Sequence, residues 1–386
     1  MLTKVDEYPV HQITDTFATV LSGDKHWNDG HYICLCDDAG DVSLVSTVRL
    51  YQNNDVLDGF VCIRHEGMQH NIRVSRRLRP EIDHYGAGPL RIEILEPMES
   101  IRLVLEENQY GISCDLVCHS VGVPFHGPLS ALRIDGRLLL ERMTYEIAGR
   151  VEGWIGVAGK RFELNHGNSG FFRNHSWGFL PGRGGPRLHG APVENAPPTA
   201  RGLRNWVLYT AKDHSGFYEF VEDEDGIQWS GAHRAVDGTL QRMTGAILNP
   251  DGQVPVTGVD HDLTFYDGTS RLSGGKIAIK DAAGTRREYE IEDMGWVYCQ
   301  AGGYFGGFND RLGQGVYRGD YHEEGEIWDC THPVKIVDNG VELDFGTVLA
   351  ESFVRLKSGD EIALAHFECA AFGPYPRYGL AGVGGS

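Results

Sequence analysis

Short apolar runs separated by glycine recur along the whole chain, and this rhythm limits the folds that it can adopt. Glycine accounts for 51 of the 386 residues and returns at intervals of about ten residues. The runs between glycines are rich in Val, Ile, Leu, Tyr and Phe, which favour strands. No amphipathic helical pattern exceeds about three turns. The sequence therefore predicts an all-β protein of antiparallel strands, arranged as sandwiches or barrels.

Two pairs of alternating runs predict β-hairpins. Residues 90–94 and 100–104 each alternate with period two and are separated by a short segment that contains proline. Residues 276–280 and 288–292 alternate in the same way around a turn that includes Asp281 and Gly284. Alternation of this kind is typical of strands with one face toward a core.

The length of the chain fits two lobes better than one. A chain of 386 residues is long for a single core. The best boundary candidate is the segment 181–204, which is dense in Pro, Gly and Arg and is expected to form a linker or a lid. We therefore predict lobes at 1–170 and 171–386. The Gly- and Pro-rich tail, 372–386, is expected to fray or to wrap the surface.

Charge and hydropathy exclude several classes of partner. The chain has 35 Lys and Arg against 54 Asp and Glu, a formal net charge of −19. Such an acidic chain repels phosphate backbones, so we expect no nucleic-acid partner. The first residues lack the apolar core of a signal peptide, and no stretch approaches the roughly 18–20 apolar residues of a membrane span. We expect a cytoplasmic protein.

Cysteine and histidine spacings predict neither disulfides nor a metal site. The eight cysteines form no C-x-x-C motif. Cys34 and Cys36 would share one face of a strand, and we expect buried, reduced thiols. The 17 histidines include no H-E-x-x-H motif, and His119 and His126 flank a turn, so we expect no metal.

The Gly-rich runs do not follow a strand–turn–helix pattern, and no G-x-S-x-G occurs. We therefore expect no nucleotide cofactor and no common hydrolase.

The segment 170–178, GFFRNHSWG, is the most distinctive in the chain. In an extended strand, Arg173, His175 and Trp177 share one face, and Asn174 and Ser176 share the other. A histidine beside a tryptophan places a proton-transfer group against an apolar, π-rich wall, which suits an apolar substrate or a developing cation. The alternative is structural: a buried His and Trp that close the seam between the two lobes.

The run RMTYEIAGRVEGWIGVAGKRFELNHGNSGFFRNHSWG, residues 142–178, resembles the AttH-like, carotenoid hydratase-related family of double-lipocalin proteins. Members carry a run of the Arg/Asp-His-x-Trp-Gly type after a hairpin of the Gly-Arg-Val-x-Gly type. The segment 204–216 resembles the first strand and turn of that family's second lobe. The resemblance implies two lipocalin-like (calycin-type) β-barrel or sandwich lobes, with a ligand site between or within them.

The resemblance also implies a type of chemistry. Relatives hydrate carotenoids and isoflavonoids or cyclise polyenes, by acid–base work on an apolar substrate without a redox cofactor. One position departs from the pattern: relatives usually place Asp immediately before the His, and this chain has Asn174. Asn cannot act as an acid, although it can orient His175 or bind a substrate hydroxyl. The acid would then be His175 itself, or an Asp or Glu elsewhere.

Two functional hypotheses follow. The first is a cofactor-independent lyase or isomerase of the hydratase, dehydratase or cyclase type, acting on an apolar terpenoid, steroid, polyketide or aromatic compound. The second is a carrier for such a ligand. An ionisable pair that faces the cavity would favour the enzyme. The expected catalytic residues are His175 and Asn174, and the expected substrate-binding residues are Trp177, Arg173, Trp206 and Tyr209.

Overall fold

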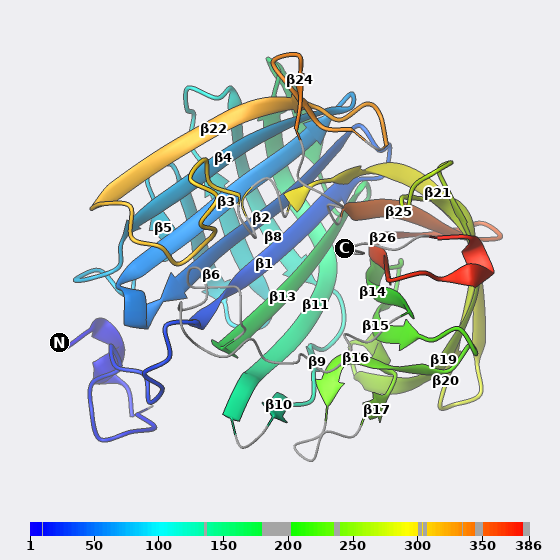
Figure 1. The fold of residues 1–386 in the computed structure, drawn as a ribbon, viewed down its shortest axis with the longest axis horizontal. Helices are drawn as coiled ribbons and strands as arrows, with labels where there is room; N and C mark the ends of the chain where they lie inside the picture. The colour runs from blue at the N-terminus through cyan, green and yellow to red at the C-terminus, as the bar shows by residue number, and fades with distance from the viewer. Residues whose placement is uncertain are drawn as a thin grey trace.

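The computed structural model describes residues 1–9, 11–134, 137–179, 202–234, 240–299, 303, 307–333, 335–343 and 350–380. These residues form two antiparallel sheets, which confirms the all-β prediction (Figure 1). The helical turns described are three short 3₁₀ turns: η1 (Lys4–Glu7), η2 (Gln52–Asn54) and η3 (Pro376–Tyr378).

The first sheet contains β1 (Trp27–Asp37), β2 (Val42–Tyr51), β3 (Val56–His65), β4 (Met68–Arg77), β5 (Gly86–Ala87), β6 (Leu90–Glu96), β7 (Ser100–Leu105), β8 (Ile112–Ser120), β9 (Phe125–His126), β10 (Ser130–Ile134), β11 (Arg137–Val157), β12 (Lys160–Leu164), β13 (Ser169–Phe179), β22 (Tyr321–Asp329), β23 (Val337–Asp338) and β24 (Val341–Glu342). Its strand order is β24-β23-β22-β4-β3-β2-β1-β13-β11-β8-β7-β6-β5, with β9, β10 and β12 paired to β11. The predicted hairpin at 90–104 is confirmed as β6 and β7.

The second sheet contains β14 (Gly202–Thr210), β15 (Ser215–Glu222), β16 (Gln228–Arg234), β17 (Leu240–Arg242), β18 (Thr244–Asn249), β19 (Gly252–Phe265), β20 (Leu272–Asp281), β21 (Arg286–Val297), β25 (Glu351–Ser358) and β26 (Glu361–Phe372). Eight of these strands close into an antiparallel barrel, because β14 pairs with both β26 and β15. The predicted hairpin at 276–292 is confirmed as β20 and β21. In Figure 1 this barrel lies beside the curved first sheet.

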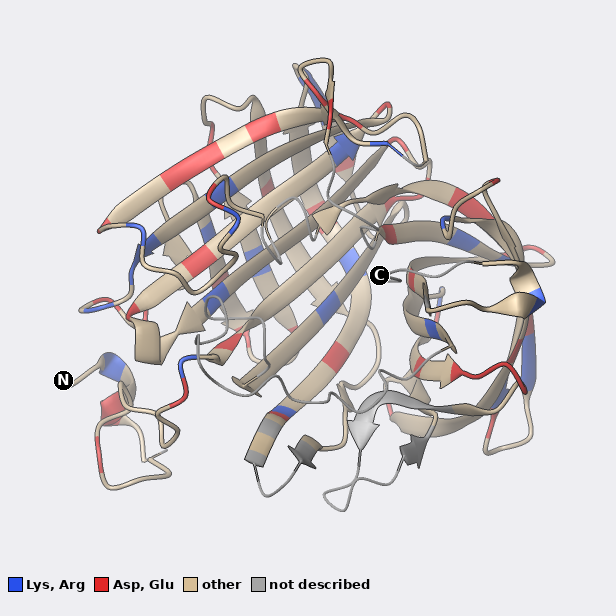
Figure 2. Ribbon diagram, in the orientation of Figure 1, with Lys and Arg blue, Asp and Glu red and all other residues tan. Residues whose placement is uncertain are grey.

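The first sheet takes strands from both halves of the chain. β13 runs across residue 170, and β22 pairs with β4 although about 240 residues separate them. The buried Arg73 of β4 holds β22 in place, since it bonds to the carboxylates of Glu324 and Glu326. Figure 2 shows these acidic residues along β22. The division into lobes at residue 170 stays a prediction about domains, and the segment 181–201 lies outside the described residues.

Three apolar clusters follow the two faces of the strands. Ile33 and Leu35 of β1 point into the curl of the first sheet. Their neighbours Cys34 and Cys36 point to the opposite face, where they pack with residues of the barrel such as Leu208. A third cluster fills the barrel. The period-two pattern therefore serves two cores at once, and β1 is buried on both faces along most of its length.

Two smaller expectations are also answered. All eight cysteines are buried and unpaired, which agrees with reduced thiols. The tail packs against the barrel as far as residue 380, with Tyr375 and Leu380 buried in its core cluster, and residues 381–386 lie outside the described part. Within the described ranges, no helix is long and apolar enough to cross a membrane.

Candidate functional site

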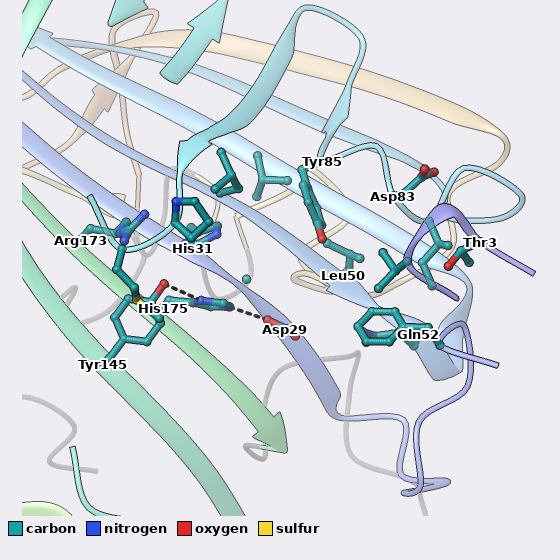
Figure 3. A pocket seen from close by; sticks show the side chains of 18 residues that line it. Thr3, Asp29, His31, Leu50, Gln52, Asp83, Tyr85, Tyr145, Arg173 and His175 are labelled. Carbon is teal, nitrogen blue, oxygen red and sulfur yellow. Dashed lines mark hydrogen bonds and ion pairs between the residues drawn. The ribbon is translucent and has the colours of Figure 1, made fainter. Parts of the chain in front are cut away.

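A pocket of about 240 Å³ opens inside the curl of the first sheet (Figure 3). Four parts of the chain surround it: strands β1, β2, β11 and β13, the N-terminal segment, the connection between β4 and β5, and the end of β6 with the turn that follows it. Its lining residues are Thr3, Val5, Phe17, Asp29, Gly30, His31, Val48, Leu50, Gln52, Ile82, Asp83, Tyr85, Ile94, Pro97, Met98, Tyr145, Arg173 and His175. The lining carries a group of polar side chains on β1, β11 and β13, and the rest is largely apolar, with Thr3, Gln52, Asp83 and Tyr85 as its polar members.

The polar group exists because β13 lies between β1 and β11. The register sets His31 of β1 and Tyr145 of β11 directly opposite His175 of β13. Residues opposite one another in antiparallel strands project to the same face, so the three side chains form one row across the sheet. Arg173 lies two residues before His175 on the same strand and therefore faces the same pocket.

His175 is hydrogen-bonded through both ring nitrogens. Its Nε2 lies 2.7 Å from Oδ1 of Asp29, and its Nδ1 lies 3.0 Å from the hydroxyl of Tyr145. An ionised carboxylate can only accept, so Nε2 carries the proton, and Nδ1 of the neutral ring accepts the Tyr145 O–H. The His175 side chain is 23% exposed and that of Asp29 is 42% exposed, so small molecules can reach this row from solvent.

Burial favours the uncharged forms of the two rings beside His175, those of Tyr145 and His31. Burial raises the pKa of the Tyr145 phenol above its ordinary value, and the negative charge of Asp29 adds to that effect. Burial lowers the pKa of His31 well below its ordinary value, with further lowering from His175 and Arg173. The His31 and His175 rings lie 4.2 Å apart between centroids. His175 therefore sits between a neutral imidazole and a neutral phenol, with the Asp29 carboxylate at its Nε2.

The structure places the predicted site residues in four different surroundings. Arg173 and His175 line the pocket. Trp177 lies beside them, its ring 5.5 Å from that of His175. Asn174 projects to the opposite face of β13. Tyr209 is buried in the core of the barrel.

Trp206 packs against a buried group of polar side chains, His366, Glu351 and Cys299, at the contact between the barrel and the first sheet. Its ring lies 5.3 Å from that of His366, whose Nε2 is 2.8 Å from Oε2 of Glu351. The thiol of Cys299 donates to the other oxygen of this carboxylate, at 3.1 Å. Trp206 thus packs between the two sheets, away from the pocket in the first sheet.

Asn174 contacts a buried carboxyl group on β11. Its Nδ2 donates to Oε1 of Glu146 at 2.7 Å and also to the hydroxyl of Thr144, which bonds the same oxygen at 2.8 Å. The second oxygen of Glu146 has no partner among the described residues. Burial raises the pKa of Glu146 to about 8, so this carboxyl group holds a proton at neutral pH.

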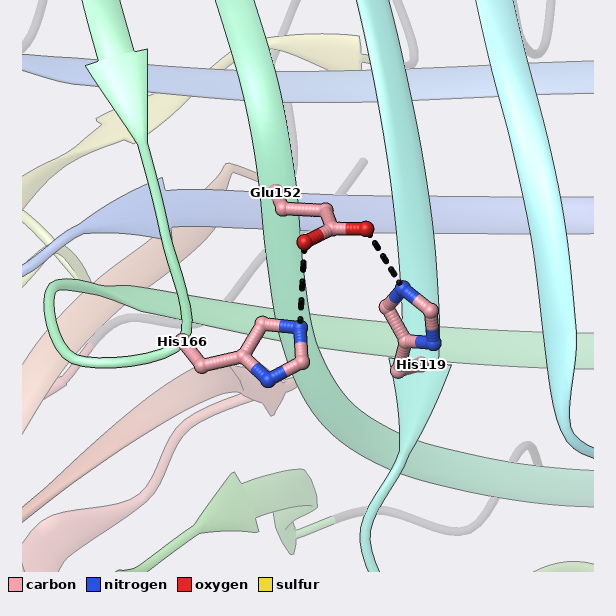
Figure 4. A group of neighbouring side chains, drawn as sticks. All are labelled: His119, Glu152 and His166. Atoms are coloured by element: carbon pink, nitrogen blue, oxygen red, sulfur yellow. Dashed lines mark hydrogen bonds and ion pairs between the residues drawn. The ribbon is translucent and has the colours of Figure 1, made fainter.

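A second cluster, on the outer face of the first sheet, has the donor set of a metal site (Figure 4). Nε2 of His119 lies 3.3 Å from Oε1 of Glu152, and Nε2 of His166 lies 3.9 Å from Oε2. These ligand atoms all lie within 4.8 Å of one another, and the group could hold a divalent ion. Asp213, His214 and Glu361 form a similar group. The sequence alone does not predict either group, because strand pairing brings their members together over long sequence separations.

Sequence reasoning also missed Asp29, His31 and Tyr145. Tyr145 stands within the run that carries the family resemblance, and Asp29 and His31 stand at the start of the first long strand. Nothing local marks them as partners of His175, because strand pairing brings them together over long sequence separations.

Comparisons with known proteins give a family and distant structural likenesses. The model of a family of unknown function (DUF8625) matches residues 2–381. A crystal structure of kievitone hydratase from Nectria haematococca is 9% identical with a TM-score of 0.45, and the alignment covers 93% of this chain and 95% of that one. A likeness this distant carries no information on activity. No curated protein sequence matches the chain.

Proposed function

The chain belongs to the family of unknown function DUF8625, which assigns no activity, and we propose from the pocket itself that the protein is a lyase or isomerase. It would bind a small, largely apolar molecule inside the first sheet and move a proton on it through Tyr145 and His175. The observation that supports this proposal is the hydrogen-bonded series Asp29–His175–Tyr145, which faces the pocket. A pocket with such a titratable series suits acid–base chemistry better than passive carriage.

The geometry supports a relay in which each group has one task. The Tyr145 oxygen takes a proton from the substrate while its own proton passes to Nδ1 of His175, 3.0 Å away. The imidazolium that forms is stabilised by the Asp29 carboxylate at Nε2, 2.7 Å away. In the reverse direction, the protonated ring supplies Tyr145, and Tyr145 protonates the substrate. Lyases and isomerases need such transfers to and from carbon.

The remaining lining suits an apolar substrate of modest size. Leu50 lies beside Asp29 on the neighbouring strand β2, and Ile82 and Met98 are among the apolar residues in the rest of the lining. The volume of about 240 Å³ is just below the usual range for ligand sites, about 300–1,000 Å³. A compact terpenoid, polyketide or aromatic compound fits these limits better than a long polyene does. Trp177 would support the wall behind His175.

The test begins with the ligand. Native mass spectrometry of freshly purified protein should reveal a co-purifying apolar molecule, and turnover of that molecule is then compared between the wild type and His175→Gln. We expect conversion by the wild type and a large loss in the variant, with binding retained. A ligand that the wild type binds but leaves unchanged between pH 5 and 9 would favour the carrier hypothesis instead.

A further inference from the structure

Arg173 gives the pocket a chemical preference that the proton relay alone does not need. We propose that the pocket selects a ligand with an apolar body and one carboxylate, and that the guanidinium of Arg173 binds this carboxylate. This inference rests on the proposed function in taking the same pocket as the ligand site, but not on any proton transfer.

Three buried arginines of the first sheet show why Arg173 is exceptional. Arg73 bonds to the carboxylates of Glu324 and Glu326. Arg49 donates to the side chain of Asn28 and to both the carbonyl and the hydroxyl of Ser176. Each of these two cations is therefore compensated by the fold itself, as buried charges normally are.

Arg173 has no such compensation. Its side chain is buried, with the residue 3% exposed, yet no carboxylate or carbonyl in the described ranges bonds to it; its Nε, like that of Arg49, has no partner among the described residues. Its contact is with a ring: the guanidinium carbon lies 5.5 Å from the centre of the Tyr145 ring. Burial lowers the pKa of this guanidinium, which reflects the cost of a charge without a counter-ion.

No neighbouring side chain in the described part of the chain supplies a negative charge to Arg173, so we expect the ligand to supply it. The titratable groups that share its electrostatic environment are Tyr145, His31 and Cys118, all neutral when buried as here. Of the two acids that line the pocket, Asp29 is engaged with His175, and Oδ2 of Asp83 lies 3.3 Å from Nζ of Lys4. A planar guanidinium matches a carboxylate through two parallel hydrogen bonds, and this match explains why a charge is kept at the wall of a largely apolar pocket.

A single guanidinium balances the one negative charge of a carboxylate, whereas it would leave one charge of a phosphate dianion unbalanced. Arg173 and His175 alternate on one strand, so their side chains emerge about 6.6 Å apart along it. A carboxylate held by Arg173 would therefore place a carbon a few bonds away beside Tyr145 and His175. The apolar rest of the ligand would extend toward Leu50 and Met98. An apolar monocarboxylic acid meets all three conditions.

Calorimetry with octanoate and octanamide tests this proposal, because the two probes differ in charge and hardly in shape. We expect the wild type to bind octanoate roughly 10- to 100-fold more tightly than octanamide. Arg173→Met should bind both probes equally, and Arg173→Lys should keep part of the preference. Arg161→Met, at an exposed arginine of the same sheet, is the matched control and should behave as the wild type.

Equal binding of both probes by the wild type would overturn the proposal, as would a preference that survives in Arg173→Met or no binding of octanoate at millimolar concentration. His175→Gln separates this inference from the proposed function. It should keep the preference for octanoate whether or not it loses turnover. A preference through Arg173 without any turnover that depends on His175 would contradict only the proposed function.

Discussion

Asp29 and His175 stand 146 residues apart in the sequence, and Oδ1 of Asp29 lies 2.7 Å from Nε2 of His175. The pairing of β1 with β13 makes this contact, since it sets Asp29 opposite Trp177 and His31 opposite His175. Asp29 is thus a diagonal neighbour of His175 on the same face. A slip of one residue would turn Asp29 to the other face and break the series. The relay therefore depends on the register of two long, well-paired strands.

His175→Gln should lower turnover of the identified ligand by roughly 10²–10⁴-fold, the usual contribution of one acid–base group. Tyr145→Phe should give a similar loss, because it removes the hydroxyl that faces Nδ1 of His175. Steady-state rates and circular dichroism measure activity and fold together. His332→Gln, at an exposed histidine just after β22, is the control. A His175→Gln variant with full activity would leave the motif with a structural role.

Glu146→Gln should flatten the pH dependence of stability. The pKa of Glu146 is about 8 in the folded protein against an ordinary value of 4.5, so between these values only the folded state holds the proton. The contribution of Glu146 to stability is therefore largest below pH 4.5 and falls by about 1.4 kcal/mol per pH unit as the pH rises toward 8. Gln keeps the shape without the charge.

Urea unfolding at pH 5, 6.5 and 8 measures this effect. The variant should gain on the wild type as the pH rises, and the difference should level off above about pH 8. Glu152→Gln, on the same strand but exposed, should track the wild type at every pH. A constant difference between Glu146→Gln and the wild type would mean that Glu146 ionises normally.

Asn174→Asp should destabilise the protein rather than retune His175. Asn174 donates to Glu146 and Thr144 on the face of β13 away from the pocket. An Asp there removes the donor and sets a second carboxyl group against the first, so one of the two must stay protonated. We expect a loss of about 1–3 kcal/mol at pH 8, seen as a lower midpoint in urea, with a smaller loss at pH 5. A shift in the pH–rate profile without any loss of stability would contradict this placement.

Zn²⁺ should bind at His119, Glu152 and His166 without contributing to folding. Three side chains on the outer face of a packed sheet leave a site open to water. Titration calorimetry should detect a site that His119→Gln removes and His126→Gln retains. Because β8 and β11, which carry His119 and Glu152, are paired without any ion, the protein should stay folded in EDTA, and added Zn²⁺ should raise the thermal midpoint only by mass action. Loss of the folded state in EDTA would identify a structural metal.

Local patterns predicted the all-β architecture, and they predicted the face that Arg173 shares with His175, because both depend on period-two alternation. They could not predict Asp29 or Tyr145 as partners of His175, since register between distant strands is not encoded in either strand alone. Nor could they show that β22 returns to the first sheet, where Arg73 meets Glu324 and Glu326. Nor could local patterns predict that Glu146 is buried, because its burial arises where the two sheets pack together.

Arg73 and Arg173 are about equally buried, but the same substitution to Met should affect the free energy of unfolding differently at the two positions. Arg73→Met leaves Glu324 and Glu326 without their cation and should cost about 3 kcal/mol. Arg173→Met removes a charge that has no counter-ion in the described fold, so it should leave stability unchanged or raise it. Thermal and urea unfolding without ligand measure both. A loss at Arg173 as large as that at Arg73 would show that the fold already compensates this charge, and would remove the reason to expect an anionic ligand.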